Sequence, residues 1–102
     1  NITEMDYIFD NATSFNQPLD SWNVSNVTNF EKAFNNCTSF NQSLSSWDVS
    51  SASNLDLMFF GSSNFNSNLS NWCVSNFSSE PLGFSIQTSL INNNKPLWGT
   101  CP

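Results

Sequence analysis

Three consecutive segments of the chain, residues 5–29, 30–54 and 55–79, repeat one 25-residue pattern without gaps. Large apolar residues recur at equivalent positions, and so does one asparagine. These rows are Phe9, Phe34 and Phe59; Phe15, Phe40 and Phe65; Asn16, Asn41 and Asn66; Leu19, Leu44 and Leu69; Trp22, Trp47 and Trp72; and Val24, Val49 and Val74. A fixed period of this length is typical of stacked repeats, because one repeat cannot bury its apolar face without a neighbour. The pattern predicts that these side chains serve the architecture first.

The repeat predicts a solenoid of about four 25-residue coils. Residues 1–79 hold the three regular repeats and a partial N-terminal start, and residues 80–102 are expected to form a degenerate C-terminal capping coil. The opening Asn1-Ile2-Thr3 matches Asn26-Val27-Thr28, so the chain is expected to start part-way through a coil, either after processing or as a segment of a longer array.

Local patterns predict two kinds of element in each coil. Thr28 followed by Glu31 has the spacing of a capping box, and the apolar residues at 30, 33 and 34 follow the i, i+3, i+4 pattern of a short helical turn. Trp47-Asp48-Val49-Ser50 alternates large apolar and polar residues, which predicts a short parallel β-strand.

The stacked rows are expected to form ladders along the molecule, about 4.8 Å apart. We expect the asparagine row to satisfy backbone groups at a bend, and Phe84 to continue the row of Phe9. A second interpretation of the tryptophans is a platform that stacks on sugars, but Val24 and its equivalents share their strand face, which favours a core role. The hydroxyl row Thr3, Thr28, Ser53 and Ser78 could suit ice or glycan binding, but it offers no flat double row.

The three cysteines fit neither a zinc site nor a CxxC motif. Cys37 takes the place of Ala12 and Ser62 in the other repeats, so we expect a small buried thiol. Cys73 and Cys101 come close together if the last coil carries one inserted residue, which leaves both a disulfide and free thiols open. A bridge there would indicate an oxidising, extracellular compartment.

Composition excludes several classes of partner. The net charge is −6 and only two residues, Lys32 and Lys95, are cationic, so the chain cannot neutralise a phosphate track or dock on an anionic membrane. In residues 1–102 we expect neither a signal peptide nor an apolar run long enough to insert in a membrane. Disorder is excluded because aromatic residues make up 15% of the chain at regular spacing.

No catalytic, metal-binding or cofactor-binding residues are predicted. Without histidine, a Ser–His or Cys–His pair cannot form. The aspartates occupy different repeat positions, so stacking does not gather them into a dyad or a calcium site; they are Asp6, Asp10, Asp20, Asp48 and Asp56. We therefore expect no enzyme activity and no cofactor.

Sequons for N-glycosylation are the strongest chemical signal in the chain. The primary candidates are Asn1, Asn11, Asn26, Asn36 and Asn76, with Asn23, Asn41 and Asn68 as secondary candidates. The alternative is that these sequons are part of the repeat pattern itself, so that their number reflects one motif repeated several times and not selection for glycosylation.

The segments NATSFNQPLDSWNVSNVTNFEKAF and NCTSFNQSLSSWDVSSASNLDLMF resemble the repeat of BspA-like bacterial surface proteins, relatives of the leucine-rich repeats. The match covers Phe15 to Phe34 and Phe40 to Phe59; the family's methionines are mostly Phe or Leu here, and residues 80–102 do not fit. The resemblance implies a leucine-rich-repeat-like solenoid at the cell surface, used in adhesion or structure.

The expected function is that of a non-catalytic extracellular structural or surface protein, a glycosylated protomer that stacks end to end in a filament. The chain stops near the point in the coil where it starts, so two chains placed end to end would continue the repeat. The alternative is an adhesin-type module that binds a cell-surface protein or glycan through its exposed polar face. Expected partners are therefore further copies of the chain, or such a protein or glycan.

Overall fold

Aromatic rings from equivalent repeat positions lie against one another in the computed structural model, which describes residues 2–102. The centre of the Phe34 ring is 5.4 Å from Phe9 and 5.4 Å from Phe59, in stacked geometry. Phe40 is likewise 5.7 Å from Phe15 and 5.8 Å from Phe65. Phe34 and Phe40 thus each lie between the equivalent rings of the two neighbouring repeats, and they belong to one buried cluster.

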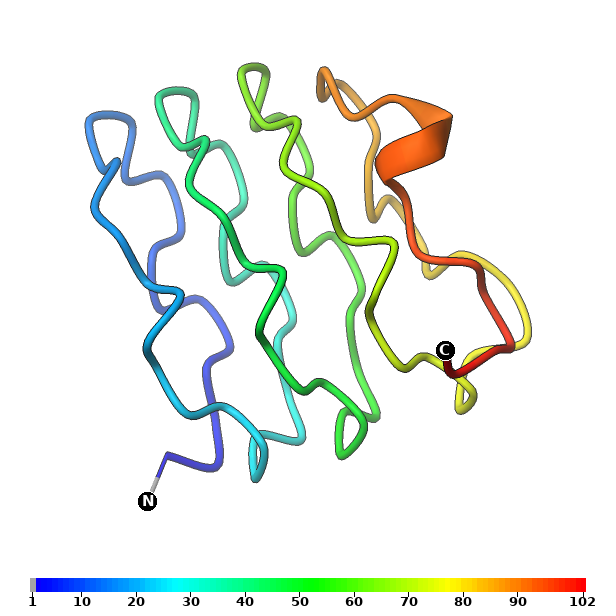
Figure 1. Cartoon of the computed structure of the whole chain (residues 1–102). Coiled ribbons are helices and arrows are strands. Elements are labelled where there is room, and N and C mark those ends of the chain that lie inside the picture. Colours follow the sequence, from blue (N-terminus) through cyan, green and yellow to red (C-terminus); the bar gives the residue numbers. More distant parts are fainter. Residues whose placement is uncertain (1) are drawn as a thin grey trace.

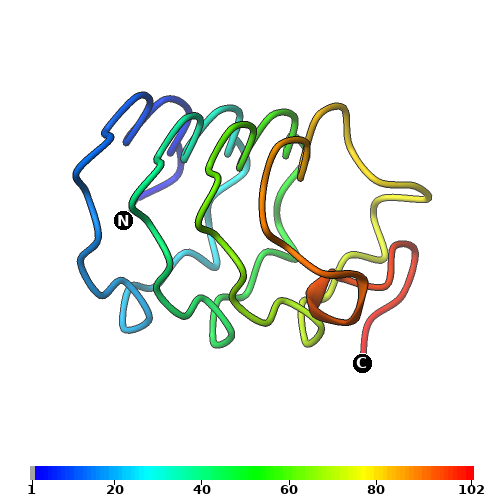
Figure 2. The ribbon, with the colours of Figure 1, turned by 90° about the horizontal axis from the view of Figure 1, so that it is seen from above.

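Successive repeats lie side by side. We name them repeat 1 (residues 5–29), repeat 2 (30–54) and repeat 3 (55–79), followed by the final segment (80–102). Figure 1 shows them in order from blue to red, with repeat 1 and the final segment at opposite ends. Seen from above, repeats 1 to 3 follow closely similar paths (Figure 2).

The predicted fold class, a leucine-rich-repeat-like solenoid with a parallel strand and helical turns in each coil, is wrong. Between residues 2 and 102 the one helix is η1, a 3-10 helix at Asn92–Asn94. Strand pairing over the same range is limited to two isolated parallel bridges, Glu4 with Asn29 and Asn29 with Asn54, and no sheet forms. The molecule is instead a compact body of turns and bends that measures 32 × 31 × 22 Å.

Alternate backbone N–H groups in each repeat donate to the next repeat. The N–H group of Tyr7 donates to the Glu31 carbonyl at 2.9 Å, and that of Phe9 donates to the Ala33 carbonyl at 3.0 Å. The N–H groups between them close short turns within their own repeat. A right-handed helix needs every N–H group for its own segment, so this division of the donors leaves no helix at residues 5–12 or 30–37.

Left-handed backbone at two positions of each repeat produces this arrangement. These positions are Tyr7 and Asn11 (φ 62° and 61°), Lys32 and Asn36 (55° and 59°), and Leu57 and Gly61 (58° and 74°). A left-handed residue every fourth position interrupts a right-handed helix. The i, i+3, i+4 spacing of Phe30, Ala33 and Phe34 therefore reports their burial correctly, since all three are fully buried, but the predicted helix does not form.

The predicted strand at Trp47–Ser50 is also replaced by turns. The Trp47 N–H group donates to the Leu44 carbonyl within the same repeat. The Asp48 carboxylate accepts from the backbone N–H and the hydroxyl of Ser50, at 3.0 and 2.6 Å. A short side chain that bonds to its own backbone in this way competes with pairing between strands.

The predicted asparagine ladder is confirmed. The side-chain oxygen of Asn16 accepts the N–H group of Asn41 at 3.0 Å, and that of Asn41 accepts the N–H group of Asn66 at 2.8 Å. The row continues as the Asn66 side chain accepts the N–H group of Ile91 at 3.0 Å. Each asparagine therefore satisfies a backbone donor of the next repeat that has no partner in its own bend.

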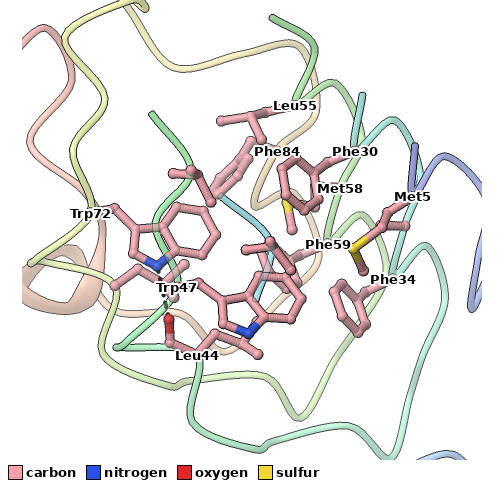
Figure 3. Close-up of a cluster of buried hydrophobic side chains, with 14 of the residues drawn as sticks. Met5, Phe30, Phe34, Leu44, Trp47, Leu55, Met58, Phe59, Trp72 and Phe84 are labelled. Carbon is pink, nitrogen blue, oxygen red and sulfur yellow. Dashed lines mark hydrogen bonds between the residues drawn. The ribbon is translucent and has the colours of Figure 1, made fainter. Parts of the chain in front are cut away.

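The tryptophans also join neighbouring repeats. The indole N–H of Trp47 donates to the Leu19 carbonyl at 2.9 Å, and that of Trp72 donates to the Leu44 carbonyl at 3.0 Å. Figure 3 shows the second of these bonds and the two indoles beside the phenylalanine rings. Trp47 and Trp72 are 3% and 1% exposed, so they belong to the core, whereas Trp22 in repeat 1 is half-buried.

The final segment departs from the register of the repeats by one residue. Lys32 donates to Asp56, which is 24 residues later, but its equivalent Leu57 donates to Leu82, which is 25 residues later. The Phe84 ring accordingly meets Phe59 at 5.3 Å with an angle of 85° between the planes. The expected continuation of the phenylalanine row thus ends in an edge-to-face contact instead of a stacked one.

Gly61 gives a test of the left-handed backbone. A Cβ atom at Gly61 would lie 2.1 Å from the Asn36 side-chain oxygen, and φ there is 74°. Because both strain and overlap oppose a side chain, we expect Gly61→Ala to lower the free energy of unfolding by about 1–3 kcal/mol.

The matched control is Gly99→Ala. Its φ is 83°, but the nearest atom to the new Cβ is the Phe77 carbonyl oxygen at 3.8 Å. Gly99→Ala introduces backbone strain alone, whereas Gly61→Ala introduces both strain and overlap. Urea denaturation measures the free energy of unfolding of each variant. An equal loss in the two would contradict the close packing of Gly61 on Asn36.

Candidate functional site

The sequon asparagines differ in whether the amide nitrogen, to which a glycan would be linked, is already used. The Asn36 nitrogen donates to the Asn11 side-chain oxygen at 3.0 Å, and Asn36 is half-buried. The Asn76 nitrogen donates to the Ser50 carbonyl at 2.8 Å. A glycan replaces one of the two amide hydrogens. On Asn36 it would therefore have to fit beside the bond to Asn11, and on Asn76, whose nitrogen also donates to the Ala52 carbonyl at 3.3 Å, it would displace a bond between repeats. The Asn11 nitrogen has only a 3.4 Å contact with the neighbouring Asp10 carboxylate.

Four other sequon asparagines are better presented. They are exposed, and their amide nitrogens donate to no residue between 2 and 102; they are Asn23, Asn26, Asn41 and Asn68. The side-chain oxygens of Asn23 and Asn68 close local turns, which holds these side chains in place. The remaining candidate, Asn1, lies outside the described residues.

The structure contains the disulfide between Cys73 and Cys101, whose Cα atoms are 4.1 Å apart. It joins repeat 3 to the end of the final segment. Beside it, the N–H group of Val74 donates to the Thr100 carbonyl at 2.9 Å. The Trp98 ring packs edge-on against Phe84 at a centroid distance of 5.0 Å. The disulfide therefore holds an aromatic side chain over one end of the core.

Cys37 is a fully buried free cysteine, as predicted. Its thiol donates to the Phe9 carbonyl at 3.0 Å, and its N–H group donates to the Ser62 hydroxyl at 3.0 Å. Ser62 occupies the same position one repeat later and donates its own hydroxyl to the Phe34 carbonyl. The two residues thus perform the same bridging role in successive repeats.

Burial raises the pKa of the Cys37 thiol from 9.0 to about 11. We expect this thiol to resist iodoacetamide at pH 8 in the folded protein and to react once the protein is unfolded. Since the unfolded thiol ionises at lower pH than the folded one, the free energy of unfolding should fall as the pH rises from about 9 to about 11.

Cys37→Ala is the control, because alanine is the natural residue at position 12. Mass spectrometry after alkylation and denaturation curves between pH 8 and 11 provide the measurements. Rapid alkylation of the folded protein, or the same pH slope in Cys37→Ala, would contradict the buried neutral thiol.

The predicted hydroxyl row lies at the surface, but its side chains bond to the backbone of the preceding repeat. The Thr28 hydroxyl contacts the Thr3 carbonyl at 3.4 Å and donates to the Glu4 carboxylate at 3.1 Å. The Ser53 hydroxyl donates to the Thr28 carbonyl at 3.2 Å. Thr28 and Ser53 therefore connect repeats, and Ser78 is exposed.

The carboxylates are dispersed, and several have a nearby polar partner of their own. Asp10 accepts from the Asn35 amide at 2.9 Å, and Asp20 accepts from the Ser46 hydroxyl at 2.6 Å. The hydroxyl and the backbone N–H of Ser50 lower the pKa of the Asp48 carboxyl. In the part of the chain that the structure describes, no pocket and no cluster of three metal-ligating side chains is present. None of these residues forms a helix that is long and apolar enough to span a membrane.

Sequence patterns missed two rows of backbone groups on the end faces. The carbonyls of Asp6, Ile8 and Asp10 on repeat 1 are equivalent to the acceptors in repeat 2, and we call them the acceptor edge. The N–H groups of Gly83, Ser85 and Gln87 on the final segment are equivalent to the donors in repeat 3, and we call them the donor edge. Neither row bonds to any residue in the range 2–102. Glycines and asparagines at the left-handed positions were the one available sequence signal.

Comparison with known proteins identifies one family. A family model described as "Mycoplasma protein of unknown function, DUF285" matches residues 1–98. No curated protein and no solved structure matches the chain.

Proposed function

The chain belongs to the DUF285 family, and we propose that it is a non-catalytic structural repeat protein that is displayed outside the cell or on its surface. The observation that carries this proposal is the bonding of equivalent side chains in neighbouring repeats. Phe34 stacks between Phe9 and Phe59, and Asn41 links Asn16 to Asn66. The aromatic rings and the asparagine side chains of these rows are used to hold the repeats together.

Two further observations support the extracellular location. The Cys73–Cys101 disulfide requires an oxidising compartment to form and persist. The resemblance of Phe15 to Phe34 to BspA-like repeats agrees with display on a bacterial surface.

Immunogold labelling of intact cells that produce the protein tests the location. We expect antibodies raised against the folded chain to label cells without permeabilisation. Labelling that appears only after permeabilisation would reject surface display. To test the compartment, a thiol-alkylating reagent is applied to the cells before lysis, and the protein is then isolated. If both Cys73 and Cys101 are found alkylated, the disulfide was reduced in the cell, which would reject the oxidising compartment.

We also propose that the protein carries N-linked glycans when a eukaryotic cell produces it, and that Asn23, Asn26, Asn41 and Asn68 are better acceptors than Asn36 or Asn76. The amide nitrogens of Asn36 and Asn76 already bond to neighbouring repeats. Intact-mass analysis of the native protein before and after peptide N-glycosidase should show a mass loss, and peptide mapping should place it at the exposed sites. An unchanged mass would reject glycosylation.

The alternative function is an adhesin-type module that binds a cell-surface protein or glycan. It is favoured by the exposed residues Thr13, Thr38 and Ser63 at equivalent repeat positions, although the Thr38 hydroxyl contacts the Thr13 carbonyl at 3.4 Å. Saturable binding of the monomer to a glycan array or to intact host cells would support this alternative. Fibrils without such binding in negative-stain micrographs would support the structural role.

A further inference from the structure

Within residues 5–11, 30–36 and 57–61, the backbone hydrogen bonds to the next repeat run in one direction, whereas elsewhere the N–H group of Ser53 donates back to the Thr28 carbonyl at 2.8 Å. The Phe34 N–H group donates forward to the Met58 carbonyl at 2.8 Å, and the Ala33 carbonyl accepts from the preceding repeat, from Phe9, at 3.0 Å. In this segment every repeat therefore presents donors on one face and acceptors on the other. A stack built in this way has two chemically different ends.

The donor edge repeats the backbone of the earlier donors. Leu57 and Gly61, which are two of the donors of repeat 3, are left-handed, and so are their equivalents Gly83 and Gln87, each with φ 61°. The carbonyls of Leu82, Phe84 and Ile86 accept from repeat 3. The N–H groups of the donor edge therefore point away from repeat 3. Their equivalents in repeats 1 to 3 likewise donate forward, to the repeat or segment that follows.

Exposed apolar side chains flank both edges. Tyr7 and Ile8 beside the acceptor edge are 46% and 42% exposed. Leu82 and Ile86 beside the donor edge are 71% and 55% exposed. A face that combines unpaired backbone groups with exposed apolar side chains is suited to a protein partner that covers both.

Repeat 1 also leaves its aromatic side chains incompletely covered. Phe9 and Phe15 are half-buried, while Phe34 and Phe40 at the equivalent positions of repeat 2 are fully buried. Repeat 2 differs in having a neighbour on each face. Covering the acceptor edge would thus bury apolar surface as well as pair carbonyls.

We propose that the donor edge of one molecule binds the acceptor edge of a second copy of this chain. The N–H groups of Gly83, Ser85 and Gln87 donate to the carbonyls of Asp6, Ile8 and Asp10 of the second copy. A partner that binds the donor edge must present alternate carbonyls on a backbone with left-handed residues, and repeat 1 of this same chain presents them. The inference rests on the proposed structural function and names its partner. Because the two faces differ, the contact is heterologous and generates open chains of molecules.

Ile86→Asp and Ile8→Asp each place a charge on one edge. Ser51→Asp, on an exposed position of repeat 2, adds the same charge away from both edges. We expect the disulfide-bonded wild-type protein and Ser51→Asp to form concentration-dependent assemblies in sedimentation velocity and thin fibrils in negative-stain micrographs. Each edge variant alone should remain monomeric and melt at the temperature of the control.

A mixture of the two edge variants gives the sharpest test. Ile8→Asp keeps an intact donor edge, and Ile86→Asp keeps an intact acceptor edge, so the mixture should form a 1:1 dimer that grows no further. A monomeric wild-type protein, assembly that survives both substitutions, or a wild-type dimer with two-fold symmetry would overturn the proposal. These results concern the purified protein, so they are independent of the immunogold result: surface display can fail while assembly succeeds, and the reverse.

Discussion

Replacing Trp47 with alanine is expected to lower the free energy of unfolding by about 3–5 kcal/mol, a large fraction of the stability of a small domain. Trp47 is 3% exposed, and its ring lies 5.9 Å from Phe30 and 6.0 Å from Phe34. Its indole N–H also donates to the Leu19 carbonyl at 2.9 Å. The substitution therefore opens a cavity between two repeats and removes one of the two donors to a buried carbonyl, the other being the backbone N–H group of Trp22. Urea denaturation followed by circular dichroism measures the loss.

Trp22→Ala is the matched control, because Trp22 occupies the same repeat position in repeat 1 and is half-buried. Its loss of stability should be clearly smaller. Equal losses of unfolding free energy at positions 22 and 47 would contradict the idea that burial of Trp47 by the preceding repeat adds to stability. If the tryptophans formed a sugar platform, Trp47→Ala would reduce affinity for a glycan with little change in the melting temperature.

Replacing Cys101 with serine is expected to lower the free energy of unfolding by about 3–4 kcal/mol, the value that chain entropy predicts for a loop of this size. The disulfide closes a loop with a sequence separation of 28 residues. It also holds Trp98 against Phe84 and Phe77, at 5.0 and 6.2 Å. Thermal unfolding without reductant, followed by tryptophan fluorescence and circular dichroism, should show the final segment loosening first.

The wild-type protein in reductant is the control for this variant. Its unfolding midpoint should fall to that of Cys101→Ser, whereas reductant should leave the variant unchanged. Cys37→Ser offers a second comparison, since Cys37 is not in the disulfide. A midpoint for Cys101→Ser that equals that of the oxidised wild type would show that the disulfide adds no stability.

Burial could be predicted from the repeat pattern. Phe34, Phe40 and Leu44 in the middle repeat are all fully buried. The asparagine row was also predicted with its role, since amides at one repeat position must face one another when repeats stack. Both predictions depend on period and polarity alone, which do not require the backbone conformation to be known.

Secondary structure could not be predicted from the same pattern. The helical spacing at residues 30–34 and the alternation at residues 47–50 both describe which side chains face the core, and turns satisfy both. Tyr7, Lys32 and Leu57 carry no sequence signal for a left-handed backbone, because side chains of this kind rarely adopt it. Packing between the repeats imposes a conformation that local preference alone disfavours.

For the candidate sites too, some properties could be predicted from the sequence and others could not. Sequons can be read from spacing, but the sequence does not show that the amide nitrogens of Asn36 and Asn76 are used between repeats. The pairing of Cys73 with Cys101 stayed open in the sequence because it depended on where the final segment gains a residue. The structure places that shift before Leu82, where the acceptor of Leu57 lies 25 residues away and not 24.

The amino-acid sequence by itself determined the repeat length and the rows of buried side chains, because burial follows from the periodic placement of apolar residues. Only the tertiary structure decided that residues 5–11 and their equivalents present donors on one face and acceptors on the other. The direction of a backbone N–H group is set by the φ and ψ angles of its neighbours, and in this molecule those angles are fixed by contact with the adjacent repeats.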